Sequence, residues 1–452
     1  MSSFRTVLVK DSNIADLTSE LNFAVESGAA STTYQQFPAS SVSSSSMIFQ
    51  VQVPSENIVL GRDPLLRSSI EFTMTISNVP AGQKYLNYGL KDSFMPFPLS
   101  SLMTTATAQI NNTTTSVNLQ DVLPQFQRLN NDVLTQKYNN MTPCMPDMNY
   151  AQYADMVNTS SNVMGAYSNA GYNNGLVPRG AFPAEITYTQ YDLSTNLPIV
   201  TTDGNISKGD DNYCVITVKA IVSEPLFLSP FTWCEPEHNA QGLLGVTNMN
   251  FNFSMDSTMK RLWSSANLQS TDPNAPYYTV MKAGINGGNL FAESPSLLFK
   301  FLSTQPSDKV ETKNVCPYMD FPRYLTSQAN ATDIVAGGTS TLTSSNLQIN
   351  QIPDKFVICV RKPMTSQGLG DSNSFLAIKS VSLNFNNQSG LLSSASQQDL
   401  WRMSQENGSE QSWYEFSGQA YDNNAGGTGA GIVQTVGSLL VISPPKDMSL
   451  PD

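Results

Sequence analysis

The chain has 452 residues, of which 24 are basic and 36 acidic, and its formal net charge is −12. This length predicts roughly two to three domains. Charged residues make up 13% of the chain, about half of the usual 25%, whereas hydrophobic residues reach 40% and suffice for a sizeable core. The few, dispersed basic residues exclude an electrostatic nucleic-acid footprint. The sequence has no apolar run of about 18 residues that would span a membrane.

Alternation of apolar and polar residues predicts short β-strands from the first third of the chain onward. The clearest example is Phe49, Val51 and Val53, which are separated by glutamines and followed by Pro54. The predicted strands are 47–53, 70–76, 105–110, 186–189, 213–222, 246–255, 297–301, 356–360, 378–385 and 436–442. Many short strands with frequent turn residues are typical of an all-β sandwich or barrel.

Helical signals are few. Residues 119–129 carry apolar side chains at helical spacing, although Pro124 lies among them. Residues 397–403 predict a second short helix. We therefore expect only a few short helices, placed in the loops of the β-fold.

A longer repeat joins the two halves of the sequence. In the first half a predicted strand ends at Asn111-Asn112. A polar stretch, a predicted helix that begins with residues 119–123 and contains Asp121, and then Arg128 follow it. The second half repeats this order after Asn386-Asn387, with Arg402 in the final position. Since internal repeats indicate repeated structural units, each half is interpreted as one copy of the same β-fold.

The repeat predicts three regions. Residues 1–45 form a polar N-terminal arm that ends in a serine run, residues 46–240 the first β-unit, and residues 241–452 the second. After its Asn-Asn turn the second unit has much less chain than the first. The second unit is therefore either shorter or incomplete at its C-terminus.

Residue types that support catalysis or metal binding are sparse. The five cysteines, Cys144, Cys214, Cys234, Cys316 and Cys359, are odd in number and far apart, which argues against a disulfide framework. His238 is the single histidine. Together with Cys234, Glu235 and Glu237 it makes a conceivable metal site, but a loop after an apolar strand is the simpler interpretation.

Other candidate sites are equally weak. The glycine-rich segment 284–288 lacks the Lys-Ser/Thr of a phosphate loop and is interpreted as a turn. Residues 203–211 contain aspartates but no glutamate at EF-hand spacing, which favours a solvated loop over calcium binding. No nucleophile elbow or dinucleotide fingerprint is present. We therefore assign no catalytic, cofactor-binding or metal-ligating residue and expect no enzyme activity.

These two tandem β-units resemble the double jelly-roll major capsid proteins of the adenovirus, virophage and polinton-like virus lineage. The resemblance rests on residues 49–54 with Arg62, on residues 109–112, on the unit from Leu383 to Arg402, and on residues 437–442. It implies an all-β fold of two tandem eight-stranded jelly rolls, 46–240 and 241–452, and a structural role in an icosahedral shell.

The resemblance also implies partners and location. Major capsid proteins of this lineage form homotrimers that tile as pseudo-hexameric capsomers, with penton and minor capsid proteins beside them. Direct sequence-specific nucleic-acid binding is not expected, and an internal membrane remains compatible with the sequence. Because residues 1–5 lack the apolar region of a secretory signal, we expect synthesis in the host cytoplasm or nucleus and a final place in the virion capsid.

Three alternatives stay open at this stage. A single jelly-roll coat protein with a protruding domain would have halves of different fold. A carbohydrate-binding β-sandwich adhesin would expose aromatic side chains such as Trp401 and Trp413 to sugars. A glycosidase would need two carboxylates at catalytic separation in a cleft. For all four tryptophans, which include Trp233 and Trp263, core packing is the favoured prediction over interface contacts.

Overall fold

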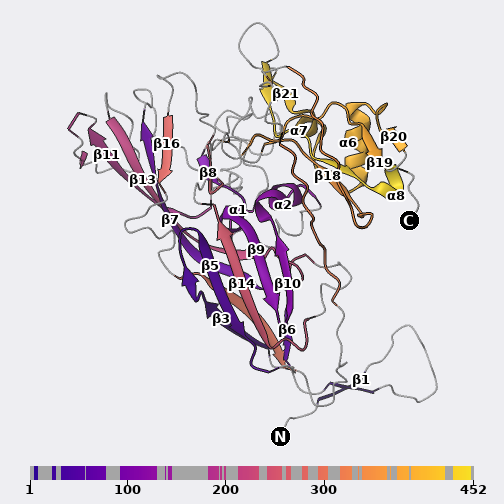
Figure 1. The fold of residues 1–452 in the computed structure, drawn as a ribbon. Helices are drawn as coiled ribbons and strands as arrows, with labels where there is room; N and C mark the ends of the chain where they lie inside the picture. The colour runs from indigo at the N-terminus through magenta and orange to yellow at the C-terminus, as the bar shows by residue number, and fades with distance from the viewer. Residues whose placement is uncertain are drawn as a thin grey trace.

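The computed structural model describes the following residues: 5–8, 23–26, 32–55, 58–77, 92–129, 138, 141–144, 182–192, 194–195, 198–199, 212–233, 242–256, 261–265, 277–282, 294–303, 316–327, 334, 338–363, 367, 374–385, 388–422 and 431–448. Two packed units are visible, an elongated β-sandwich and a smaller unit beside one of its ends (Figure 1).

The first unit consists of two antiparallel sheets. One contains, in spatial order, β10 (Thr113–Val117), β9 (Met103–Ile110), β14 (Asn248–Met255), β5 (Ser46–Gln52) and β4 (Ser41–Val42). The other contains β12 (Pro198–Ile199), β11 (Glu185–Asp192), β13 (Asn212–Pro225), β7 (Leu65–Ser77), β17 (Ser296–Ser303) and β3 (Thr32–Pro38), with β16 (Tyr277–Lys282) on β7 and β6 (Ile58–Leu60) on β17. Two short pairs, β1 (Arg5–Leu8) with β2 (Phe23–Glu26) and β8 (Asp92–Phe94) with β15 (Trp263–Ser265), complete the strands up to Ser303.

Strict alternation of side chains builds the core between these sheets. Along β14 every second residue is buried, and the other residues are exposed. Phe251 of β14 lies 6.0 Å from Phe299 of β17, ring centre to ring centre, so the two sheets face one another. Trp263 is fully buried and contacts Phe72 and Phe94 edge-on, at 5.6 and 5.3 Å. Burial of this aromatic set removes a large apolar area from water and is the main stabilisation of the unit.

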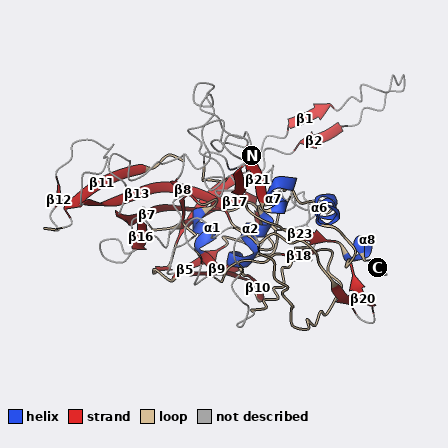
Figure 2. Cartoon of the chain, turned by 90° about the horizontal axis from the view of Figure 1, so that it is seen from above, coloured by secondary structure: helices blue, strands red, loops and turns tan. Residues whose placement is uncertain are grey.

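The second unit has its own core and less regular structure. Its helices are α6 (Gln397–Glu406), α7 (Trp413–Ser417) and α8 (Pro444–Asp447). Its strands form the pairs β18 (Phe356–Ile358) with β23 (Leu440–Ile442), β19 (Leu383–Phe385) with β20 (Gln388–Leu391), and β21 (Gln419–Asp422) with β22 (Gly431–Gln434). Leu400, Phe416, Leu440, Ile442 and Met448 are the buried centre of this core. Seen from above, α6, α8 and β20 lie at the opposite side of the molecule from β11 and β12 (Figure 2).

In the second unit, buried polar side chains make hydrogen bonds to backbone groups of nearby segments. The backbone N–H of Ile378 donates to the Ser438 hydroxyl at 2.8 Å. The buried Gln411 bonds the backbone on both sides of Ser438, since its Nε2 donates to the Gly437 carbonyl and its Oε1 accepts from the Leu439 N–H. Backbone bonds from Phe375 to Val436 and from Ser438 to Leu376 join the same two segments, and the side chains supply partners for further backbone groups.

The sequence predicted most strands of the first unit but missed where this unit ends. The predicted boundary at 240/241 lies inside these sheets as the structure has them, because β14 pairs with β5 and β9, and β17 pairs with β7. The first unit therefore continues to Ser303. The expected arm, 1–45, likewise contains β3 and β4, which belong to the two sheets.

The mostly β fold with few helices is confirmed. The sheets of the first unit hold five and eight strands. In the described part of the second unit, the predicted strands 378–385 and 436–442 pair only over their last three residues. Both helix predictions are correct: α2 (Leu119–Phe126) and α6 begin where the sequence predicted.

The predicted repeat is visible in the structure. In the first unit the hairpin β9–β10 turns at Asn111 and Asn112 and leads into α2. In the second unit β19 and β20 pair as a hairpin and lead into α6. The same order of hairpin and helix in both units supports a duplicated fold.

A buried carboxylate fixes the helix α1 (Pro98–Leu102) at the end of the sandwich. Glu224, at the end of β13, is fully buried and accepts bonds from the N–H groups of Leu99 and Ser100, both at 2.8 Å. The Ser100 hydroxyl donates a third bond at 2.6 Å. These first-turn N–H groups have no partner inside the helix, so a strand residue supplies their acceptor. Burial raises the pKa of Glu224 to about 7, and the bonds from Ser100 and Leu99 oppose this shift.

We predict that Glu224 makes the stability of the chain depend on pH. The folded chain keeps this proton to about pH 7, whereas the unfolded chain loses it near pH 4.5. The free energy of unfolding therefore contains a component of about 3 kcal/mol that is fully present below pH 4.5 and is lost as the pH rises through 7. Urea unfolding at pH 5 and pH 8 should show this loss in the native chain and not in Glu224→Gln. The exposed Glu185→Gln is the matched control and should behave like the native chain; an equal pH dependence in Glu224→Gln would contradict the assignment.

Candidate functional site

The candidate metal and phosphate sites of the sequence lie outside the described residues. This holds for residues 234–238, for the glycine-rich segment 284–288 and for the aspartate loop 203–211. Among the residues that the structure describes, no three His, Cys, Asp or Glu side chains gather where they could hold a metal ion. No helix in this described part is long and apolar enough to cross a bilayer.

Trp401 and Trp413, which a carbohydrate-binding adhesin would expose to sugars, pack against the core of the second unit. Trp401 and Trp413 are half-buried against its core and contact each other edge-on at 5.8 Å. The Trp401 indole N–H donates to the Gln411 carbonyl at 2.9 Å. Trp233 and Trp263 are buried in the first core, as predicted. The arrangement of Trp401 and Trp413 offers no open pair of rings on which a sugar would stack.

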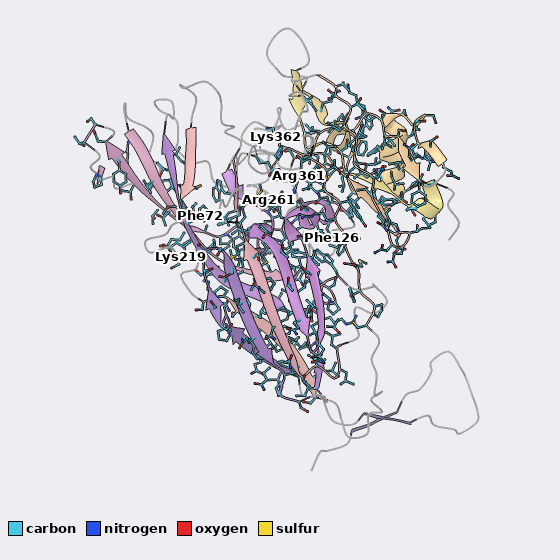
Figure 3. All side chains as sticks on the ribbon, in the orientation of Figure 1. Phe72, Phe126, Lys219, Arg261, Arg361 and Lys362 are labelled. Carbon is cyan, nitrogen blue, oxygen red and sulfur yellow. The ribbon has the colours of Figure 1, made fainter. Side chains whose placement is uncertain are left out.

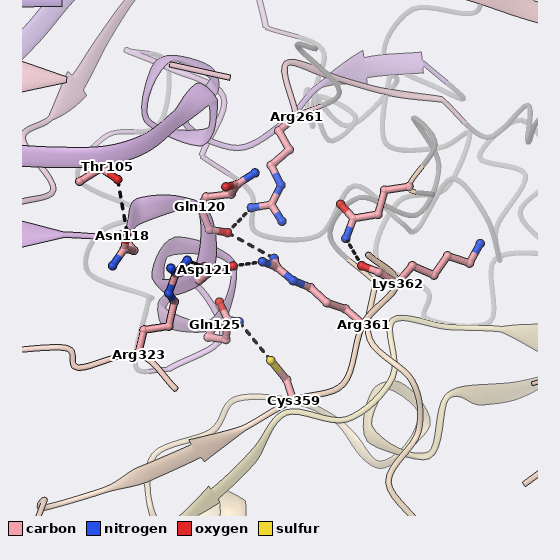
Figure 4. Close-up of polar contacts among 11 residues, drawn as sticks. Thr105, Asn118, Gln120, Asp121, Gln125, Arg261, Arg323, Cys359, Arg361 and Lys362 are labelled. Carbon is pink, nitrogen blue, oxygen red and sulfur yellow. Dashed lines mark hydrogen bonds and ion pairs between the residues drawn. The ribbon is translucent and has the colours of Figure 1, made fainter. Parts of the chain in front are cut away.

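The contacts that join the two units gather on α2, and we call this region the junction. It comprises α2 and residues 127–129 with their partners at 233, 261 and 375 and in segments 321–323, 359–361 and 409–410. Figure 4 shows its polar part, around Gln120, Asp121 and Gln125. The labelled side chains Phe126, Arg261 and Arg361 lie between the two units (Figure 3). The junction has a polar side at the start of α2 and an apolar side at its end.

Pro124 creates the polar side. In an α-helix the carbonyl of Gln120 would accept from the N–H four residues later, but that residue is Pro124, which has no N–H. The free Gln120 carbonyl instead accepts from Arg261 of the first unit and, at 3.3 Å, from Arg361 of the second. A proline within α2 thus supplies an acceptor that both units share.

Asp121 adds two ion pairs to the polar side of the junction. Its carboxylate pairs with Arg361 through one oxygen and with Arg323 through the other. The two helices of the repeat use this position differently. In α6 the corresponding Asp399 forms a capping box with Ser396, whereas in α2 the side chain of Asn118 makes no capping bond and instead accepts from Thr105 at 3.3 Å. Asp121 is therefore available to bind the arginines across the junction.

Burial changes the ionisation of the basic and thiol groups in the junction. Arg261 is almost wholly inaccessible, and burial lowers its pKa to about 10 although Asp256 favours its charged form. Burial also lowers the pKa of Arg361 and raises that of Cys359. Cys359 Sγ accepts a bond from Gln125 Nε2 at 3.1 Å. Arginine stays charged at neutral pH under such shifts, so these groups act as fixed charges and donors.

Aromatic and backbone contacts form the apolar side. Phe321 packs edge-on against Trp233 at 4.8 Å and against Phe126 at 6.3 Å. The Arg128 guanidinium lies 5.1 Å from the ring centre of Phe375 in the second unit. The Glu410 N–H donates to the Arg128 carbonyl at 2.9 Å, so the two backbones meet directly.

The sequence did not indicate the junction as a site. Its members are far apart in the chain, with Gln120 and Arg361 separated by 241 residues. The one local signal was Pro124 inside a helical pattern, because an internal proline leaves a carbonyl without its helical donor. This arrangement supports no bond-making chemistry; it fixes one β-unit against another.

We predict that Asp121→Asn weakens the chain more than the equivalent change in α6. The change leaves the partly buried Arg361 without its carboxylate, which should lower the free energy of unfolding by about 2–4 kcal/mol. Asp399→Asn is the matched control at the same helix position and should cost about 1 kcal/mol, since it removes only an exposed cap. Thermal unfolding of the three proteins in low salt measures both effects; equal losses for the two variants would show that the pairing with Arg323 and Arg361 contributes little.

Two separate family models match this chain, and they divide it at about the same place as the two units of the structure. Residues 2–302 match the family model described as the Sputnik virophage major capsid protein 1st domain. Residues 321–452 match the model described as the major capsid protein V20 C-terminal domain. The first match ends at residue 302, next to the end of β17, and the second begins at residue 321.

Individual relatives agree with these models. The putative capsid protein V20 of Sputnik virophage is 27% identical over 412 residues, which cover 89% of this chain and 63% of the relative. The chain thus spans less than two thirds of the length of that curated relative. The cryo-EM structure of the Sputnik virophage matches with 25% identity and a TM-score of 0.72 over 99% of this chain and 82% of the other. The mavirus major capsid protein, 16% identical with a TM-score of 0.56 over 100% of this chain and 85% of the other, shares the fold.

The resemblance to double jelly-roll major capsid proteins is therefore confirmed by sequence and by structure. The first family model alone covers more than half of the sequence. Its match ends where the paired strands of the first sandwich end. The chain belongs to the Sputnik virophage major capsid protein family.

Proposed function

We propose that the chain is a structural subunit of an icosahedral virophage shell, in which it forms homotrimeric, pseudo-hexameric capsomers. The observation that carries this proposal is the junction: two β-units in one chain are fixed to each other through α2, whose carboxylate and free carbonyl hold arginines from both sides. Three such chains present six β-units, which suits a tile of nearly hexagonal outline. Closed cyclic symmetry is the usual arrangement of identical subunits.

The proposal extends to the division of the chain. We place the boundary between the two jelly rolls after Ser303 and before Phe321, where the paired strands of the first unit end and the second family match begins. The region before Thr32 is then the only part that remains an N-terminal arm. This division replaces the boundary that the sequence pattern suggested.

Partners and location follow from the shell role. We propose contacts with neighbouring capsomers, penton proteins and minor capsid proteins, no direct sequence-specific binding of nucleic acid, and synthesis in the host cytoplasm or nucleus before incorporation into the virion capsid. The net charge of −12 supports the absence of nucleic-acid binding, because phosphate contacts depend on clustered lysine and arginine. In the junction the described arginines already bind protein oxygens.

Solution mass tests the proposed trimer. Light scattering on the purified chain should give about 148 kDa, three times the 49.2 kDa of one chain. The measurement is made over a hundredfold range of concentration, so that a weak trimer is detected by its growth with concentration. A mass of 49.2 kDa at every concentration would contradict the capsomer proposal.

A further inference from the structure

One buried carboxylate holds three segments together at the end of the first sandwich. Glu224 of β13 accepts hydrogen bonds from the first turn of α1 and a longer one, at 3.5 Å, from the Thr142 hydroxyl. The segment 141–144 is also tied to β13 by the Ser223 N–H, which donates to the Met141 carbonyl at 2.9 Å. A single side chain therefore determines how α1 and residues 141–144 lie against the sheet.

The residue before α1 is held in a strained conformation. Phe97 is buried, and its φ of 48° lies in the left-handed region, which glycine adopts easily and residues with a Cβ do not. Its N–H donates to the Pro143 carbonyl at 2.6 Å, so the segment that contacts Glu224 also holds Phe97. Strained backbone persists only where its surroundings impose it. Weaker bonds around Glu224 would therefore let α1 relax away from the sheet.

In the described surroundings no opposite charge compensates an ionised Glu224. Burial and hydrogen bonds shift its pKa, and no charged group is among the causes. α1 has no titratable side chain, and the described residues of 138–144 add Tyr138 and Cys144, which are neutral near pH 7. On β7 the partner of Glu224 is Leu66, whereas the adjacent Arg67 is exposed. Loss of the proton leaves a buried anion among neutral donors, which is costly unless water reaches it.

A row of aromatic rings connects α1 with the junction. Phe97 packs edge-on against Phe227 at 4.9 Å, and Phe227 lies 5.7 Å from Trp233. Trp233 contacts Phe126 of α2 at 5.3 Å and Phe321, where the second family match begins, at 4.8 Å. α1 also packs directly against α2 (Figure 1). Because these side chains are closely packed, a shift of α1 is transmitted to the apolar side of the junction.

We propose that Glu224 and α1 form a proton-operated latch that sets how firmly the two β-units are held together. With the proton bound, α1 stays closed on the sheet and the rings from Phe97 to Phe321 keep their packing. Without the proton, α1 opens, water reaches Glu224 and the junction loosens. The latch goes beyond the shell role, because it concerns two units within one chain and operates in a single copy.

Hydrogen exchange of the full chain, measured by mass spectrometry at pH 5 and pH 8, tests the latch. The closed state keeps the Glu224 proton to about pH 7, whereas an open state loses it near pH 4.5, so closure is favoured most in acid. After correction for intrinsic exchange rates, the opening constant of residues 97–103 should rise about fiftyfold from pH 5 to pH 8. That of residues 119–129 should rise by roughly fivefold or more.

The exposed hairpin turn 109–114 is the internal control, since it opens locally without α1, and its corrected exchange should not change with pH. Equal corrected exchange of residues 97–103 at both pH values would overturn the proposal.

Variants separate the latch from its connection to the junction. Glu224→Gln cannot ionise and should make the corrected exchange of residues 97–103 equal at both pH values. Phe227→Leu interrupts the row of rings and should keep the pH dependence at 97–103 but reduce it at 119–129. Phe49→Leu removes an equally buried ring outside the row and should behave like the native chain. Thermal unfolding at pH 5 verifies that each variant is folded. If residues 119–129 of the native chain do not respond to pH, or if Phe227→Leu and Phe49→Leu respond alike, the proposed control of the junction is wrong.

Discussion

One missing N–H in α2 determines how the two β-units are held together. Pro124 leaves the Gln120 carbonyl without a helical donor, and Arg261 and Arg361 bind it from opposite sides. Asp121, one residue on, neutralises part of the positive charge that these arginines bring. Removing arginines from water is costly unless they gain both a countercharge and good acceptors. The first turn of α2 supplies both.

Composition explains the unusual construction of the second unit. The chain has few charges and many hydroxyl and amide side chains, and the unit uses these side chains inside its core. Ser404 is buried and both donates to the Leu400 carbonyl and accepts from the Val441 N–H, so it links α6 to β23. Asn407 donates to the carbonyl of Val441 and to Asp447 at the end of α8. Neutral groups of this kind can be buried at lower cost than charges, provided that each has a partner.

The sequence predicted the parts of the fold that depend on local pattern. The strands around Phe49 and Phe251 were visible because their side chains alternate strictly, and the hairpin-to-helix repeat was visible because Asn-Asn turns and Asp-Leu helix starts recur. The extent of the first unit was not visible, since the pairing of β17 with β7 is a long-range contact that no local period encodes. The junction was missed for the same reason. Its residues lie far apart in the sequence and are brought together by the tertiary structure.

The two units differ in how many bonds hold each stretch of backbone. In the first unit a strand such as β7 is bonded to neighbours along its whole length, so the loss of one side chain leaves the ladder intact. In the second unit single side chains, such as those of Gln411 and Ser438, supply the hydrogen-bond partners of several backbone groups. The first sandwich can therefore tolerate sequence drift at polar positions that the second cannot. Over evolutionary time the hydroxyl and amide residues buried in the second unit should change more slowly than polar residues on the strands of the first.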